Sequence, residues 1–301
     1  MSNKSGIQVK SQVALLFSAA FWGSSFIFTK GLFESEPYIT TNIIVMGRLL
    51  VATALFLPLL CLTGKMERIR KGDLGMLMLL SLWEPFLYMF LETSGVRLVP
   101  SSLASLIVAT IPLFVPFAMA AVYKERLSVW AVVGVVLSLV GIAAITLFDK
   151  AGASGEIHAL GIVFLSLAVL VAVIYTLWLV KVLQLYKPFT VTTYQNLFAL
   201  IYFIPIVLIF NSDALPMLSY SGAMWGRIAF LGLFCSTGAY VLFNYGIKAA
   251  GATAASVYNN LIPVFTLLLA ALMGVETITF VKVGGIVLVI GGLFLVQRNN
   301  K

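Results

Sequence analysis

The sequence predicts an all-α membrane protein with ten transmembrane helices in two inverted five-helix repeats. Three observations predict it: an apolar composition, ten apolar runs of spanning length, and a segment that recurs 151 residues later. Of the 301 residues, 61% are hydrophobic and 10% are charged, and the mean hydropathy is +1.07. Soluble domains average about 45–50% apolar and about 25% charged residues. The charges are too few to solvate a globule of this size, which excludes a soluble enzyme, a nucleic-acid binder and a disordered scaffold.

The apolar runs are separated by polar residues, glycine or proline, and each is long enough for one crossing. A helix needs about 20 apolar residues to span a bilayer, and backbone groups in lipid need internal hydrogen bonds, so runs this long predict helices. Short connections around Pro100 and Gly251 predict two tight hairpins. The expected spans are residues 11–31, 38–62, 74–97, 100–123, 127–148, 158–183, 188–210, 222–248, 252–273 and 277–297.

The first span has an alternative interpretation as a signal peptide. Two lysines precede the apolar run, and Ser18-Ala19-Ala20 within it is similar to a cleavage site. The run continues past this triplet, and the internal repeat needs the segment as a span. We therefore expect the segment to be retained as the first helix.

Lysine and arginine are distributed unequally between the two sets of loops that these spans create. Cytoplasmic loops of membrane proteins carry an excess of these residues. The distribution predicts a multi-pass protein of the cell membrane with both termini in the cytoplasm, and it explains the net charge of +8 without a nucleic-acid partner. The N-terminal side holds thirteen (Lys4, Lys10, Lys65, Arg68, Arg70, Lys71, Lys124, Arg126, Lys181, Lys187, Lys248, Arg298 and Lys301) and the other side five (Lys30, Arg97, Lys150, Arg227 and Lys282).

An internal repeat divides the chain into residues 10–148 and residues 157–297. Five spans separate its two copies, and because five is odd the halves are expected in opposite orientations. Inverted repeats are typical of alternating-access transporters. The matched residues, all 151 apart, are Gly95, Ala104, Ser105, Pro112, Phe114, Glu125, Gly134 and Gly141 in the first copy and Gly246, Ala255, Ser256, Pro263, Phe265, Glu276, Gly285 and Gly292 in the second.

Short motifs in both halves resemble one transporter family. They are Phe21-Trp22-Gly23-Ser24-Ser25 followed by Lys30, Gly47-Arg48-Leu49-Leu50, Ala104-Ser105-Leu106-Ile107, Pro112-Leu113 and Glu125-Arg126-Leu127. Over nearly its whole length the chain resembles the EamA family of the drug/metabolite transporter superfamily. The second half keeps the proline, the glutamate and both glycines, but Thr277-Ile278 follows its glutamate. The resemblance implies two EamA-type repeats around a central cavity and export of amino acids or related metabolites.

Two charged residues fall near the middle of predicted spans. Arg48 and Glu84 each lie about ten residues from a span end, hence about 15 Å deep. A charge at the centre of a bilayer costs about 2.5–3.5 kcal/mol on insertion scales, so both side chains are expected to face a cavity or each other. Arg48 then holds a substrate carboxylate while Glu84 couples transport to protons. The alternative is a fixed ion pair that only orders the bundle.

Further polar and aromatic residues are candidates for the cavity lining, with ordinary packing as the alternative for each. Glu84, Tyr88 and Glu92 recur every four residues and share a helical face. Glu92 is expected near the outer interface, where solvation makes its charge inexpensive and no role is required. Pro112 and Pro263, at matching positions of the repeat, are expected to kink their helices and act as hinges. The other candidates are Trp22, Ser25, Tyr175, Trp178, Tyr240, Asn244, Asn259 and Asn260.

These features together predict a secondary transporter that exports small metabolites by alternating access. A facilitative uniporter and a multidrug or cation efflux protein are the alternatives, and an intramembrane enzyme is a remote one. His158, the single histidine, lies in a connecting segment, and Cys61 and Cys235 are far apart in sequence, so we expect no catalytic residues, no metal and no cofactor. The expected partners are a small-molecule substrate and the lipid bilayer; the oligomeric state stays open.

Overall fold

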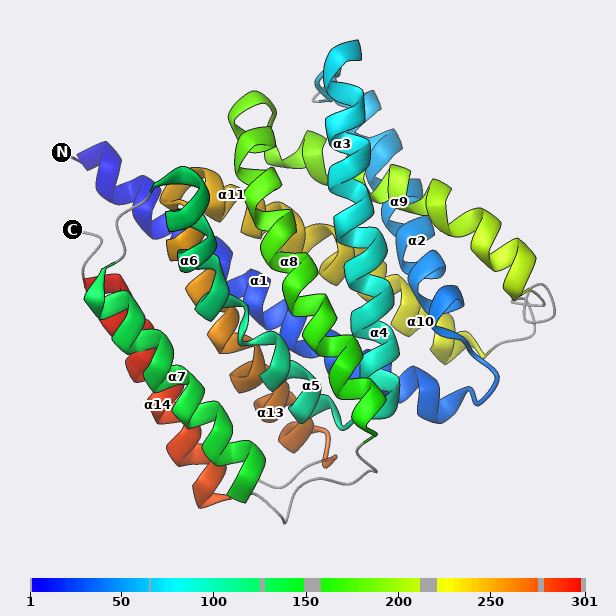
Figure 1. The fold of residues 1–301 in the computed structure, drawn as a ribbon. Coiled ribbons are helices and arrows are strands. Elements are labelled where there is room, and N and C mark those ends of the chain that lie inside the picture. The colour runs from blue at the N-terminus through cyan, green and yellow to red at the C-terminus, as the bar shows by residue number, and fades with distance from the viewer. Residues whose placement is uncertain are drawn as a thin grey trace.

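The chain folds into a bundle of helices, and a computed structural model describes residues 2–64, 66–124, 128–148, 158–211, 221–275 and 279–298. Figure 1 shows the bundle, in which helices distant in sequence pack side by side. The α-helices are α1 (Ser2–Ser35), α2 (Thr41–Leu62), α3 (Leu74–Ser81), α4 (Tyr88–Leu98), α5 (Ser101–Val108), α6 (Ile111–Tyr123), α7 (Val129–Phe148), α8 (Ala159–Leu185), α9 (Pro188–Phe210), α10 (Gly222–Phe230), α11 (Ala239–Ala250), α12 (Ala252–Ser256), α13 (Ile262–Leu272) and α14 (Phe280–Arg298).

Eight helical segments within the described residues are long and apolar enough to cross a membrane. They coincide with the first to fourth and sixth to ninth predicted spans, within a few residues at each end. The other two predicted spans correspond to α7 and α14, whose described apolar stretches, Val132–Gly141 and Phe280–Gly292, are shorter. The predicted helical fold is therefore confirmed over the described residues, with eight of the ten predicted spans supported. Glu125, Glu276 and the loop residues Lys65, Arg126, Lys150 and Lys301 lie outside the described residues.

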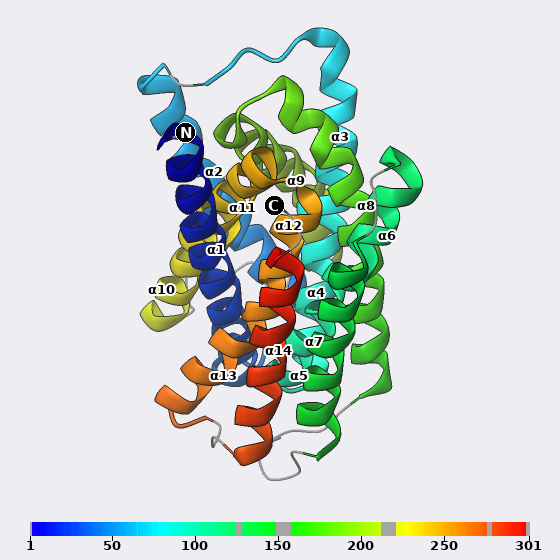
Figure 2. The same cartoon turned by 90° about the vertical axis from the view of Figure 1, so that its left-hand side faces the viewer.

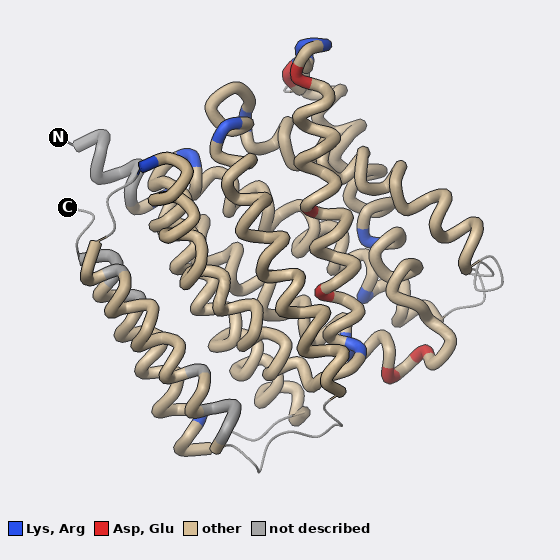
Figure 3. The backbone as a smooth tube through the Cα atoms, in the orientation of Figure 1, with Lys and Arg blue, Asp and Glu red and all other residues tan. Residues whose placement is uncertain are grey.

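Charged positions are concentrated at the two ends of the bundle, and only a few lie within its middle (Figure 3). The triplet that is similar to a cleavage site lies inside the bundle, where Ser18 Oγ donates a hydrogen bond to the carbonyl oxygen of Ala239 at 2.9 Å. The first helix thus contributes to the core like the other spans.

The third and eighth spans are interrupted at matching points of the repeat. A π-helical segment, η2 (Leu82–Leu87), joins α3 to α4, and a second, η5 (Leu231–Gly238), joins α10 to α11. In η2 the cause is local: a residue that precedes proline is pushed out of the helical region, and Glu84 before Pro85 has φ −149° and ψ 125°. Such interruptions leave backbone groups without helical partners at mid-span, which must be satisfied from neighbouring helices.

The fourth and ninth spans are also broken, and the breaks correct the prediction for Pro112 and Pro263. Both prolines were predicted inside continuous helices, where each would kink the axis. Instead, Pro112 lies in the first turn of α6 and Pro263 in the first turn of α13. Proline is well tolerated there because a first-turn residue has no helical acceptor for its N–H. The 3₁₀ segment η6 (Val257–Leu261) precedes α13, so both prolines begin a new helical segment after a break.

Glycines allow α7 and α14 to pack closely, as Figures 1 and 2 show. A Cβ added at Gly141 would lie 2.6 Å from the carbonyl oxygen of Gly285. A Cβ at Gly292 would collide with the carbonyl oxygen of Gly134 and with Ser138 Oγ. Each repeat therefore contributes two glycines to one helix interface within a single chain.

We expect Gly292→Ala to destabilise the protein, by about 1–3 kcal/mol, because the added methyl group meets backbone rather than a flexible side chain. Gly284→Ala in the same helix is the matched control, since nothing lies within 4 Å of its added Cβ. Thermal unfolding of both variants in detergent measures the effect. Equal melting temperatures for the two variants would contradict the close approach of α7 and α14.

Candidate functional site

A cavity lies between helices of the two repeats, lined from α1, α2, α4, α5, α6, α8, α11, α12 and α13 and from the segments η2 and η6. The cavity has a volume of about 40 Å³, which is room for a few water molecules. Three predicted residues do not line it: Trp178, Asn244 and Asn260. Eight predicted site residues do line it, namely Trp22, Ser25, Arg48, Glu84, Tyr88, Tyr175, Tyr240 and Asn259.

Glu84 is held at the cavity wall by groups from the second repeat. The hydroxyl of Tyr240 donates to Glu84 Oε1 at 2.6 Å. Gln195 Nε2 donates to the backbone carbonyl of Glu84 at 2.8 Å and to the hydroxyl of Tyr175 at 3.1 Å. The Gln195 amide thus supplies a hydrogen-bond donor to the backbone carbonyl of Glu84 in the interrupted segment. The hydroxyl of Tyr240 holds the Glu84 side chain in position.

Arg48 is buried beside the cavity and its guanidinium is only partly satisfied. It is 2% exposed, and Arg48 Nε donates to Ser236 Oγ at 3.1 Å. Its Nη1 is buried and has no hydrogen-bond partner. Among the described side chains, no ion pair joins Arg48 to Glu84 or Glu92. The structure therefore contradicts the fixed Arg48–Glu84 ion pair and leaves a buried guanidinium that can accept an anionic group.

Glu92 is more buried than predicted. It is 6% exposed and lines the cavity, so the expectation of a solvated carboxyl group is wrong. The reason is packing: α4 contacts both α2 and α8, which covers the face that carries Glu92. Glu84, Tyr88 and Glu92 therefore all line the cavity along one face, as their spacing of four indicates.

The three predicted residues outside the cavity have other partners. Trp178 packs against the hydrophobic core, with the Lys181 ammonium 5.6 Å from its ring centroid. Asn244 Nδ2 donates to Thr192 Oγ1 at 3.0 Å. Asn260 Nδ2 donates to Ser138 Oγ at 3.0 Å. Their contacts fasten helices to one another rather than shape the cavity.

A polar face of α9 was missed from the sequence. Gln195 reaches η2, and the adjacent Asn196 Nδ2 donates to the backbone carbonyl of Ser236 in η5 at 3.1 Å. Neighbouring side chains of one helix thus satisfy backbone carbonyls in both interrupted spans. The available signal was the polar run 190–196 inside a predicted span, which is expensive in lipid unless it faces protein.

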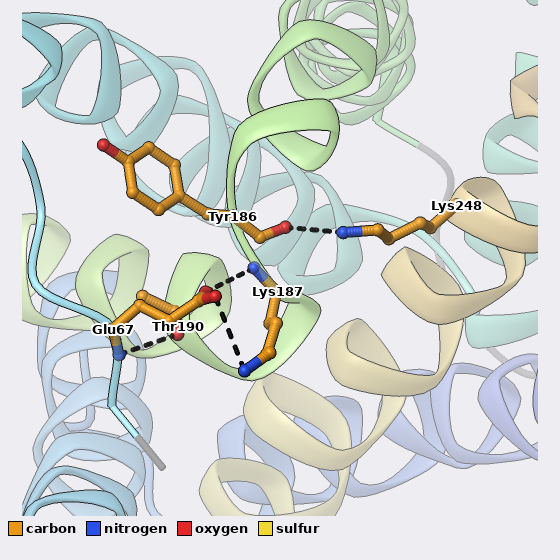
Figure 4. Close-up of polar contacts among 5 residues, drawn as sticks. All are labelled: Glu67, Tyr186, Lys187, Thr190 and Lys248. Carbon is orange, nitrogen blue, oxygen red and sulfur yellow. Dashed lines mark hydrogen bonds and ion pairs between the residues drawn. The ribbon is translucent and has the colours of Figure 1, made fainter. Parts of the chain in front are cut away.

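Polar contacts close one end of the bundle, a cluster that we call the first clasp (Figure 4). Lys187 forms an ion pair with Glu67 at 3.6 Å, and its backbone N–H donates to Glu67 Oε2 at 2.6 Å. Lys248 Nζ donates to the carbonyl oxygen of Tyr186 at 3.1 Å. The hydroxyl of Tyr186 donates to Asp73 Oδ2 at 2.6 Å, and this bond raises the pKa of Tyr186, so the donor keeps its proton at neutral pH. The first clasp joins the α2–α3 connection to the second repeat.

A second clasp closes the opposite end of α2. Ser221 Oγ, which caps the start of α10, donates to Glu36 Oε1 at 2.6 Å. Arg227 Nη1 donates to the carbonyl oxygen of Gly31 at 2.6 Å. Glu36 precedes α2 and Glu67 follows it, so the two clasps lie at opposite ends of this helix.

Known proteins resemble this chain over nearly its full length. An uncharacterized transporter from Archaeoglobus fulgidus is 28% identical, over 97% of this chain and all of that protein. The uncharacterized transporter YetK from Bacillus subtilis is 25% identical, over 98% of this chain and 90% of that protein. A solved crystal structure has the same fold, with a TM-score of 0.77 and 17% identity over 96% of each chain.

The model of the EamA-like transporter family matches the chain twice, at residues 10–147 and 159–298. The two matches cover the two halves related by the internal repeat, and the bundle that they form encloses the cavity. They also confirm the resemblance drawn from the motifs around Trp22, Arg48 and Pro112. On this evidence the chain belongs to the EamA-like transporter family.

Proposed function

We propose that the protein is a secondary transporter that exports small metabolites, amino acids among them, by alternating access through the central cavity. The observation that carries the proposal is a buried cavity between the two repeats that contains a partly satisfied guanidinium and two carboxyl groups. Buried charged groups in membrane spans mark substrate and ion pathways. Arg48 receives an anionic group of the substrate, and the Glu84 carboxyl carries the coupled proton.

The ten-helix inverted-repeat arrangement belongs to this proposal, and the two clasps support it. The first clasp connects the α8–α9 junction to the start of the third span, through Tyr186 and Asp73. The second connects the α1–α2 junction to the start of the eighth span, through Glu36 and Ser221. Equivalent parts of the two repeats thus meet at opposite ends of the bundle, which is the relation expected for an inverted pair.

Counterflow in proteoliposomes tests the transport function. Vesicles that contain the purified protein and are loaded with one unlabelled solute receive trace labelled solute, with amino acids, sugars and organic cations screened in turn. We expect saturable uptake that is stimulated by the same solute on the opposite side. Flux that neither saturates nor shows trans-stimulation would indicate a facilitative pore, and no exchange with any solute class would contradict the proposal.

The proposed orientation places the first clasp in the cytoplasm, because thirteen of the loop cations lie on that side. In a variant with Cys61 and Cys235 replaced, a cysteine at Arg68 is therefore expected to react with a membrane-impermeant thiol reagent only in inverted vesicles. A cysteine at Tyr38, which lies in the α1–α2 connection and is 86% exposed, is the matched control for the other side. Reaction of the Arg68→Cys variant in right-side-out cells would reverse the orientation.

Pro112 and Pro263 serve as hinge residues in this proposal, because each starts a helical segment after a break. We expect Pro112→Ala and Pro263→Ala to shift the balance of inward- and outward-facing states in opposite directions, with slower turnover and retained binding. Pro58→Ala, in the continuous helix α2, is the control. The readout is cysteine accessibility from the two sides of the membrane. Identical labelling patterns in the wild type and both hinge variants would exclude the hinge role.

A further inference from the structure

Arg48 and Glu92 form an unusual pair in the cavity wall. They project from adjacent helices, α2 and α4, and they are 2% and 6% exposed. No ion pair is formed between them among the described side chains, and Arg48 Nη1 has no hydrogen-bond partner. Both residues line the same cavity. A basic and an acidic side chain therefore line one small cavity without forming an ion pair with each other.

Burial makes an unpaired charge on either side chain expensive. An isolated buried charge is costly, and the cost falls when an opposite charge with hydrogen-bonding atoms is supplied. A simple carboxylate would satisfy Arg48 and leave Glu92 unpaired, and a simple amine would do the reverse. A molecule that carries both charges close together satisfies the two groups at once.

Glu84 differs from Glu92 because its carboxyl group already has a hydrogen-bond partner within the protein. Its Oε1 already accepts the hydrogen bond of Tyr240 at 2.6 Å, and its backbone is fixed by Gln195. No hydrogen bond is recorded for the Glu92 carboxylate among the described residues. The free carboxylate of the cavity is therefore that of Glu92.

The remaining wall favours an apolar substituent on the bound molecule. The ring of Trp22 packs edge-on against those of Tyr240 and Phe243, with centroids 5.2 Å and 5.0 Å apart. All three side chains line the cavity. They provide a nonpolar surface beside the two charged groups.

On the basis of the proposed transport function, we propose that the cavity selects zwitterions, with the substrate carboxylate on Arg48 and the substrate ammonium on Glu92. Glu92 is then a specificity-determining residue. It distinguishes an α-amino acid from the same molecule without its amino group, whereas Arg48 distinguishes it from the same molecule without its carboxylate.

Equilibrium binding to the purified full chain in detergent tests this assignment without interference from passive leak across a bilayer. Two matched sets serve as probes: L-leucine, 3-methylbutylamine and 4-methylpentanoate, and L-alanine, ethylamine and propionate. We expect at least one amino acid to bind the wild type about tenfold or more tighter than both of its analogues, since each charged hydrogen bond contributes at least that factor.

The variants separate the two charges. We expect Glu92→Gln to weaken binding of that amino acid about tenfold or more. Binding of the carboxylate analogue is expected to stay unchanged. Arg48→Gln is expected to weaken binding of the amino acid and to leave binding of the amine analogue unchanged. Glu34→Gln, which changes an exposed carboxyl, is the control, and thermal unfolding of each variant establishes that it is folded.

Three results would overturn the assignment: no binding by either amino acid, equal binding of an amino acid and its carboxylate analogue, or unchanged amino-acid affinity in folded Glu92→Gln protein. Saturable counterflow of a different solute class alongside any of these results would leave the proposed transport function in place. The absence of saturable counterflow for every class would contradict the transport function itself.

Discussion

Arg48→Gln is expected to lower the apparent substrate affinity in counterflow about 10–100-fold. Hydrogen bonds to charged groups contribute about 1.5–3 kcal/mol, and a factor of ten in affinity corresponds to about 1.4 kcal/mol. The guanidinium is buried, is anchored through Nε to Ser236, and has Nη1 free for a ligand. Glutamine keeps a polar side chain but removes both the charge and the paired donors.

Two further variants make this prediction specific. Arg48→Lys keeps the charge but not the guanidinium fork, so we expect an intermediate affinity. Arg70→Gln changes an exposed arginine and is expected to leave affinity unchanged. Because no ion pair joins Arg48 to Glu84, the effects of Arg48→Ala and Glu84→Ala on transport are expected to multiply in the double variant. Wild-type affinity in folded Arg48→Gln protein would exclude Arg48 from the substrate site.

Glu84→Gln is expected to abolish accumulation driven by a pH gradient while counterflow of substrate continues. Glutamine has nearly the same shape and keeps an oxygen that accepts the hydrogen bond from Tyr240, but its amide does not bind and release a proton as a carboxyl group does. Substrate exchange needs only the cavity, whereas pH-driven accumulation needs a group that is protonated on one side and deprotonated on the other. The measurement is uptake into proteoliposomes with and without an imposed pH gradient.

The control for this experiment is Glu34→Gln, which changes a carboxyl outside the cavity and is expected to retain both activities. Unchanged pH-driven accumulation in Glu84→Gln protein would remove Glu84 from the coupling step. Loss of both counterflow and pH-driven accumulation would assign Glu84 to substrate binding instead.

The helices were predictable because the bilayer limits the choices of the chain. Long apolar runs in lipid form helices, and eight of the predicted spans coincide with helices of spanning length. The repeat also singled out the glycines at which α7 and α14 approach closely, although Gly141 meets Gly285 and Gly292 meets Gly134 rather than their own repeat equivalents. For the cavity, spacing correctly grouped Glu84 with Tyr88 on one helical face.

The remaining features depend on packing between helices, which periodicity does not specify. The burial of Glu92 follows from the contacts of α4 with α2 and α8. Tyr175 lines the cavity and Trp178 does not, although both side chains of α8 pack in the same hydrophobic core. Gln195 contributes to the site because the helix is interrupted at Glu84, which leaves a backbone carbonyl that accepts a hydrogen bond from α9. Pro85 beside Glu84 was a visible signal of that interruption, but its partner is fixed only in three dimensions.

Two-sided accessibility of the cavity tests alternating access most directly. Ser25 lines the cavity and is 2% exposed, so Ser25→Cys in a chain without native cysteines reports on entry from either side. Impermeant thiol reagents applied to right-side-out and inverted vesicles are expected to label it from both sides, and a transported substrate is expected to slow both reactions. Labelling from one side alone, unchanged by substrate, would contradict alternating access through this cavity.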